Sequence, residues 1–117
     1  MKKTMFAFIQ CMLLLGCGFS FVEVPGETRN SPEIANFAAK QIFSSLRYEA
    51  PGCYDGKVLN TVFNRYTSTK NKNSWQETWT VDMCGKRFEA RVDFYTMDGR
   101  PETTTVGIDG KGLKQLN

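Results

Sequence analysis

Two kinds of apolar spacing follow each other along this chain. Between residues 34 and 46 apolar side chains recur at steps of three to four, which is the spacing of one face of a helix. Its members are Ile34, Phe37, Ala38, Ile42 and Leu46. Odd positions from Trp75 to Met83 and even positions from Phe88 to Phe94 are mostly apolar, a period of two that is typical of strands with one buried face. We therefore expect a helix followed by antiparallel strands.

The start of the helix has favourable capping residues. Ser31 can accept from the free amide donors, Pro32 suits the first helical position, and Glu33 lies near the positive end of the helix dipole. We expect the helix to run to about Tyr48, before Pro51-Gly52. The residues expected to face away from its apolar stripe are Asn36, Lys40, Ser44 and Arg47. A helix beside uncovered strands usually buries such a stripe in its own core.

The strand pattern also predicts pairing. Lys57 to Thr69 is expected as a first strand, followed by a polar loop from Thr67 to Asn73. A two-residue Gly85-Lys86 turn would place Met83 opposite Phe88, Val81 opposite Ala90 and Trp79 opposite Val92. On the other face the same register would make Asp82 and Glu89 direct neighbours. That face would carry Gln76, Thr78, Thr80 and Asp82 against Tyr95, Asp93, Arg91 and Glu89.

A last strand is predicted at Thr103 to Ile108. A three-residue loop, Asp98-Gly99-Arg100, would oppose apolar to apolar side chains. The expected pairs are Phe94 with Thr104, Val92 with Val106 and Ala90 with Ile108. The glycine-rich stretch Asp109 to Gly112 predicts a turn, and the tail from Leu113 to Asn117 is expected to be loose. The predicted fold class is α+β, with one N-terminal helix packed on a four-stranded antiparallel meander.

The first 17 residues resemble the signal of bacterial lipoproteins. Met1-Lys2-Lys3 is a cationic start, Met5 to Leu15 is apolar, and Leu14-Leu15-Gly16-Cys17 is similar to the lipobox, with Leu15 larger than the residue usual at its place. The resemblance implies cleavage before Cys17 and fatty acylation of Cys17, which gives a durable membrane tether. It divides the chain into a signal peptide at 1–16, a lipidated N-terminus and tether at 17–29, and one α+β domain at 30–117.

Two alternatives for this segment remain open. It can be an ordinary secretory signal that releases a soluble protein, although no clean A-x-A site is present. It can also be an uncleaved anchor, although polar and small residues interrupt the stretch from Met5 to Val22, where a spanning helix needs about 20 apolar residues. The lipoprotein resemblance implies a location in the bacterial cell envelope, at the outer membrane facing the periplasm. The alternative location is soluble, periplasmic or secreted.

Cysteine usage fits an exported protein. With Cys11 removed and Cys17 acylated, Cys53 and Cys84 remain as an even pair, and we expect them to form a disulfide. A bridge over about 31 residues would stabilise the fold by roughly 3 to 4 kcal/mol. A redox or metal site is disfavoured, because C-x-x-C is missing and the chain has no His. No cofactor and no metal are expected.

The order of elements is similar to the cystatin-type arrangement, in which a sheet wraps a long helix. Inhibitors of that family carry a Q-x-V-x-G hairpin tip, and the matching stretch around Lys57 to Thr69 lacks it. The resemblance is therefore one of topology and implies nothing about protease inhibition.

Charge and composition limit the function. Without Lys2 and Lys3, 13 basic residues face 12 acidic ones, which does not suggest a nucleic-acid partner. The absence of His removes the commonest general base, so we expect no enzyme. The preferred hypothesis is a lipid-anchored binding, assembly or inhibitor module with an unidentified protein partner. Its candidate binding residues, chosen because Tyr and Arg are favoured at interfaces, are Tyr66, Lys70, Lys72, Arg91 and Tyr95.

Two further hypotheses stand beside the binding module. One is a hydrolase of cell-wall glycan that uses only carboxylates, with Asp82 and Glu89 as an acid/base pair. The other is a purely structural component of the envelope. A deep cleft holding both carboxylates would favour the hydrolase, and a flat charged sheet face would favour binding.

Overall fold

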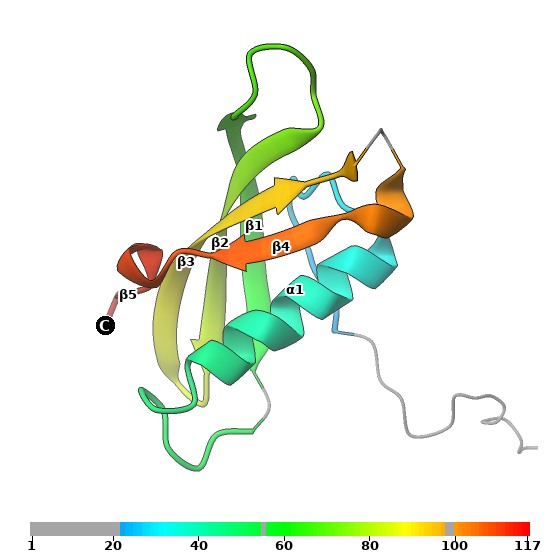
Figure 1. Cartoon of the computed structure of the whole chain (residues 1–117). Coiled ribbons are helices and arrows are strands. Elements are labelled where there is room, and N and C mark those ends of the chain that lie inside the picture. Colours follow the sequence, from blue (N-terminus) through cyan, green and yellow to red (C-terminus); the bar gives the residue numbers. More distant parts are fainter. Residues whose placement is uncertain (1–21, 55, 98–99) are drawn as a thin grey trace, which may run out of the picture.

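The α-helix of the described residues lies across one face of an antiparallel sheet (Figure 1). The computed structural model describes residues 22–54, 56–97 and 100–117. Within them the elements are α1 (Pro32–Ser45), β1 (Lys57–Tyr66), β2 (Ser74–Met83), β3 (Lys86–Tyr95), the 3-10 helix η3 (Pro101–Thr103), β4 (Thr105–Ile108), the 3-10 helix η4 (Gly110–Gly112) and β5 (Lys114–Gln115). The strands follow the order β1-β2-β3-β4, with β5 also pairing with β3. The predicted α+β class, with one helix on a four-stranded meander, is confirmed.

The start of α1 is as predicted and its end is earlier. The amide of Ile34 donates to Ser31 Oγ at 3.3 Å, and Pro32 is the first helical residue. The helix ends at Ser45 rather than near Tyr48. The chain tightens there into bonds to the third preceding residue, with Glu49 N donating to Leu46 O at 3.1 Å. The α-helix therefore ends in this tighter turn, before the chain reaches Pro51-Gly52.

The buried face of α1 differs from the predicted stripe, and two of its residues are reversed. Phe37 was expected to face the core and is 50% exposed, whereas Asn36 was expected in solvent and is 5% exposed. Three of the residues that the helix buries are alanines, of which Ala38 and Ala39 are 0% exposed. Its buried apolar residues are Ala35, Ala38, Ala39, Ile42 and Phe43. Burial of Asn36 is compensated, because its Oδ1 accepts from the amide of Val22 at 2.7 Å.

The β2–β3 hairpin keeps its predicted faces but not its predicted register. Val81 lies opposite Phe88 and Trp79 opposite Ala90, two residues from the predicted pairing. The turn is formed by Cys84 (φ 56°) and Gly85 (φ 96°) instead of Gly85-Lys86. Positive φ at both central residues is the type I′ geometry that matches the twist of paired strands. A shift of two residues returns every side chain to the same face, so the apolar face remains correct.

The β3–β4 connection is longer than the predicted three-residue loop. Phe94 pairs with Val106 and Val92 with Ile108, again two residues from the prediction. The strand starts at Thr105 rather than Thr103 because Pro101–Thr103 forms η3, in which Thr103 N donates to Arg100 O at 2.9 Å. The predicted loop residues Asp98 and Gly99 lie outside the described residues.

The first strand is shorter than predicted, the polar loop from Thr67 to Asn73 is confirmed, and the C-terminal tail is structured. β1 ends at Tyr66 rather than Thr69, where Thr67 N donates to Ser74 O at 2.9 Å. The tail that was expected to be loose forms β5, in which Lys114 lies opposite Glu89 on β3. A further bond from Leu116 N to Arg87 O, 2.8 Å long, extends this contact. Backbone pairing therefore holds the C-terminal residues, although their sequence has little strand pattern.

Residues 22–29, which we call the strap, lie against the domain. The sequence predicted them to be part of a tether, but their backbone bonds to β1: Glu27 N donates to Thr61 O at 2.8 Å. Thr28 N donates to Thr61 Oγ1 at 2.9 Å, and that hydroxyl donates to Pro25 O at 2.8 Å. At Gly26 (φ 109°) a Cβ would come within 2.4 Å of Thr61 O, so the close approach requires glycine. The strap thus covers part of the free edge of β1.

Candidate binding surfaces

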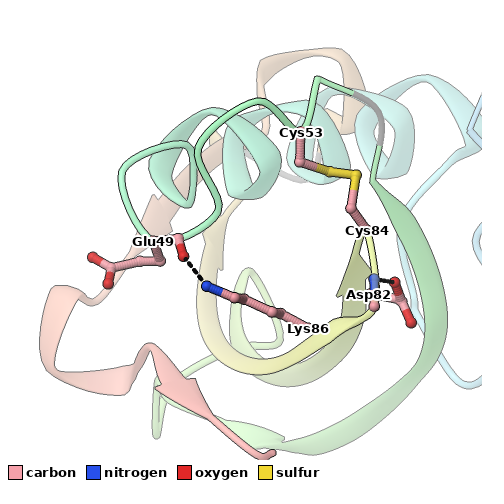
Figure 2. Close-up of a disulfide and its surroundings, with 6 residues drawn as sticks. Glu49, Cys53, Asp82, Cys84 and Lys86 are labelled. Atoms are coloured by element: carbon pink, nitrogen blue, oxygen red, sulfur yellow. Dashed lines mark hydrogen bonds between the residues drawn. A yellow bond between two sulfur atoms is a disulfide. The ribbon is translucent and has the colours of Figure 1, made fainter.

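The disulfide joins the loop after α1 to the tip of the β2–β3 hairpin. Cys53 and Cys84 are bonded with a Cα–Cα distance of 5.9 Å, as predicted (Figure 2). Lys86 Nζ donates to Glu49 O at 3.1 Å across the same junction. The disulfide therefore holds the loop after α1 against the tip of the β2–β3 hairpin, although the two cysteines are 31 residues apart in the sequence.

Asp82 and Glu89 are not directly opposite each other, as the predicted register would have placed them. In the observed register Asp82 lies opposite Arg87, and Glu89 lies opposite Thr80. Asp82 Oδ1 instead accepts from the amide of Gly85 at 2.8 Å and supports the turn (Figure 2). The expected pairing is wrong because the turn begins one residue earlier than predicted. Asp82 and Glu89 thus lie on the same face of the sheet but are not directly opposed.

Glu77 is a buried carboxylate that the sequence interpretation missed. It lies on the inward face of β2 with an exposed fraction of 0%. Three N–H groups donate to it: Trp75 Nε1 at 2.9 Å and Arg29 N at 2.8 Å to Oε2, and Trp79 Nε1 at 2.8 Å to Oε1. A buried carboxylate is tolerated when such donors replace water. The spacing W-x-E-x-W, with Glu at an inward position between two indoles, was the available signal.

The role of Glu77 follows from these bonds. Both of its oxygens are engaged by the protein, and through Arg29 N one of them holds the end of the strap against the sheet. The carboxylate therefore connects the strap to the core. Its bonds do not suggest a ligand site.

Three of the five candidate binding residues lie at the end of the β1–β2 hairpin. Lys72 Nζ lies 5.4 Å from the ring centroid of Tyr66, and Lys70 is exposed in the same loop. The Cζ of Arg29 lies 4.3 Å from the ring centroid of Phe63 and 5.5 Å from that of Tyr66. The Phe63 and Tyr66 rings meet edge to face at 4.9 Å. We call Arg29, Phe63, Tyr66 and Lys72 the Tyr66 cluster.

The other two candidate residues lie on the opposite face of the sheet. Tyr66 pairs with Trp75, which is buried, and so points to the side of α1. Arg91 and Tyr95 occupy exposed positions of β3, on the outer face. Arg91 Nη2 contacts Asp109 Oδ2 at 3.2 Å in an exposed ion pair. The five residues therefore do not form one surface.

A recess of about 240 Å³ lies between the strap and the start of α1. It is lined by Val22, Val24, Thr28, Asn30, Pro32 and Ala35. A second recess of about 250 Å³ is lined by Glu89, Arg91, Lys111, Gly112 and Lys114 beside η4. The candidate binding residue Arg91 thus borders this second recess.

Neither a metal centre nor a membrane-spanning helix is found in the part of the chain that the structure describes. Across residues 22–54, 56–97 and 100–117, no three acidic or cysteine side chains are grouped so as to hold a metal ion. None of the helices in these ranges is long and apolar enough to cross a bilayer. Cys17, the predicted lipidation site, lies outside the described residues.

Comparison with known proteins assigns no family. No protein family, curated protein or solved structure matches this chain. The resemblances to a lipoprotein signal and to the cystatin arrangement therefore stay predictions.

Proposed function

We propose that this chain is a small, lipid-anchored protein of the bacterial envelope that acts by binding another protein and catalyses no reaction. The Cys53–Cys84 disulfide is the observation that carries the proposal, because such bonds persist in oxidising compartments and are rare in the cytosol. The lipobox-like Leu14-Leu15-Gly16-Cys17 supplies the route of export and the anchor. Its location is then the outer membrane, facing the periplasm.

The length of chain between Cys17 and the strap limits how far the domain can move from the bilayer. Val22 is the first residue that the structure describes, and its amide donates to Asn36 Oδ1 in α1. Five residue steps separate Cys17 from Val22, and they span at most about 18 Å. A domain on so short a tether presents one region to its partner within a narrow layer above the lipid.

The Tyr66 cluster is the proposed protein-binding surface. Tyr66 and Arg29 are residue types enriched at the centres of interfaces, and stacking of the guanidinium on two rings restricts its motion before binding. Arg29, Lys70 and Lys72 place three positive charges at this end of the molecule. We therefore propose a partner with an acidic surface, because opposite charges steer association.

The anchor is tested on protein purified from the membrane fraction of its own host. Mass spectrometry is expected to find an N-terminus at Cys17 that carries acyl chains. Replacement Cys17→Ser is expected to move the protein from the membrane to the soluble fraction, and Cys11→Ser is the matched control that leaves it in the membrane. Protein that begins at another residue without lipid would contradict the proposed anchor.

The binding surface is tested by photo-crosslinking in cells. A photoreactive residue at position 72 is expected to give a discrete crosslinked species, and one at position 44, on the exposed side of α1, is the control. Tyr66→Ala and Arg29→Ala are expected to remove that species, whereas Tyr48→Ala leaves it, because Tyr48 is 92% exposed in the loop after α1. Equal crosslinking from positions 72 and 44 would refute the Tyr66 cluster as the site.

A further inference from the structure

The outer face of the sheet carries a hydrogen-bonded row of polar side chains across three strands. Asn64 Nδ2 donates to Gln76 Oε1 at 3.2 Å and to Thr78 Oγ1 at 2.8 Å. Arg65 Nη1 donates to the same Gln76 oxygen at 3.1 Å, and Gln76 Nε2 donates to Asp93 Oδ1 at 3.3 Å. We call Asn64, Arg65, Gln76, Thr78 and Asp93 the polar row. These bonds arrange its members before any ligand arrives.

The polar row retains both donors and acceptors. Arg65 has five N–H groups and uses one of them within the row. Asp93 has a second carboxylate oxygen, and the Thr78 hydroxyl can still donate. A hydroxyl group of a ligand both donates and accepts, so a ligand with several neighbouring hydroxyls can use alternating groups of this kind. A ligand with acceptors only, such as a phosphate, would leave the Asp93 carboxylate unmatched.

Tyr95 adds an apolar surface beside the polar row. It follows Asp93 by two residues on β3, so both side chains stand on the same face, and it is 50% exposed. Its ring offers an apolar face together with a polar hydroxyl. A sugar ring has the complementary pattern, with C–H groups on one face and hydroxyls around its edge. Tyr95 can therefore cover the ring while the polar row binds the hydroxyls.

The neighbouring strand leaves this region open. Gly107 on β4 lies opposite Asp93 and has no side chain, and a Cβ placed on it would approach only Asp93 O, at 3.8 Å. Thr105, the neighbour of Tyr95 on β4, is short and exposed. An extended ligand can thus pass from β1 across Asp93 toward β4.

The net charge of this region indicates which class of polymer it can bind. The polar row contains one cation, Arg65, and one carboxylate, Asp93, so it has no net charge. Arg91, the next basic residue on the same face of β3, is already paired with Asp109. A nucleic acid or an anionic lipid surface requires an excess of basic groups, which this region lacks.

We propose that the polar row and Tyr95 form a binding site for a neutral glycan chain. The site lies on the opposite face of the sheet from the Tyr66 cluster and does not rest on the lipid anchor or on a protein partner. The proposed role is binding alone, and the polar row itself contains one carboxylate, Asp93, where a glycoside hydrolase uses two.

The test uses the full exported chain in detergent, with triacetylchitotriose and maltotriose as neutral probes and trigalacturonate as the charged comparison. Saturation-transfer NMR is expected to show contact with the sugar C–H groups of a neutral probe, with weaker or no contact for trigalacturonate. Tyr95→Ala is expected to lower affinity by about tenfold, and Tyr95→Phe to retain most of it, because the ring is kept. Gln76→Ala is expected to weaken binding through loss of the centre of the polar row.

Tyr48→Ala is the matched control, because it removes a more exposed tyrosine from the loop after α1. Circular dichroism is used to verify that each variant is folded. No contact with either neutral probe at millimolar concentration would overturn the proposal. Tighter binding of the charged probe than of the neutral probes would also overturn it. So would a Tyr95→Ala variant that binds as well as the original protein, or a Tyr48→Ala variant that weakens binding as much as Tyr95→Ala does.

Discussion

The indole N–H of Trp79 donates a 2.8 Å hydrogen bond to Oε1 of Glu77, and both side chains are fully buried. The arrangement places a carboxylate inside the apolar face of the sheet and surrounds it with donors. Because Arg29 N donates to the other oxygen, the same carboxylate fixes the end of the strap. One side chain thus joins the core of the domain to the segment that leads toward the proposed anchor.

Replacing Glu77 by Gln is expected to destabilise the fold by about 1–3 kcal/mol. The amide nitrogen would point at an N–H donor, leaving that donor unsatisfied in the interior. Urea unfolding followed by tryptophan fluorescence measures the change. Glu89→Gln, a half-buried outer-face position opposite Thr80, is the control and is expected to change stability by less than about 0.5 kcal/mol. Equal effects of the two replacements would show that the bonds to Glu77 contribute little.

Removal of the disulfide is expected to cost about 2–5 kcal/mol. The variant with both Cys53→Ser and Cys84→Ser loses the link between the loop after α1 and the hairpin tip. Thermal unfolding with and without a reducing agent measures the effect. The original protein is expected to lose stability in the reducing agent, and the double variant to be insensitive to it. An original protein that is equally stable under both conditions would contradict this account.

The alternation of apolar residues was enough to predict the faces of the sheet, but it could not determine register. Pairing Val81 with Phe88 or with Ala90 buries the same side of both strands, because the two choices differ by two residues. The turn decides between them, and it uses Cys84 at positive φ, which is uncommon for a residue other than glycine. The spacing of apolar residues does not indicate which residues of a turn adopt a positive φ.

The candidate surfaces were only partly predictable for a related reason. Tyr66 and Lys72 are close in sequence and meet in space at the end of the β1–β2 hairpin. The approach of Arg29 to Phe63 and Tyr66 depends on how the strap crosses β1, and no local pattern in residues 22–29 indicates that path. The sequence therefore could not predict the Tyr66 cluster in full, because its formation depends on the long-range packing of an irregular segment.

Gly85→Ala is expected to destabilise the protein by about 1–2 kcal/mol. A Cβ there would meet nothing within 4 Å, so the cost is conformational and comes from the φ of 96°. Gly110→Ala is the matched control, because that residue also has open space around it but does not have a positive φ. Chemical denaturation of both variants provides the comparison. If Gly110→Ala costs as much as Gly85→Ala, the turn geometry is not the cause.

The final prediction concerns the attachment of the strap. Thr61 is 0% exposed, and its hydroxyl accepts from Thr28 N and donates to Pro25 O. Thr61→Val keeps the shape but leaves both backbone groups unpaired, so we expect a loss of about 1–3 kcal/mol. Hydrogen exchange is expected to accelerate at the amide of Thr28 before the centre of the sheet is affected.

Thr80→Val, at a half-buried position on the outer face of β2, provides the control for replacing Thr by Val within a strand. It is expected to leave exchange at Thr28 unchanged. If Thr61→Val also left that exchange unchanged, the Thr61 hydroxyl would not be what attaches the strap. The bond from Glu27 N to Thr61 O, at 2.8 Å, and the bond from Phe63 N to Glu27 Oε1, at 3.1 Å, do not involve the hydroxyl. These two bonds would then be the attachments that remain along β1.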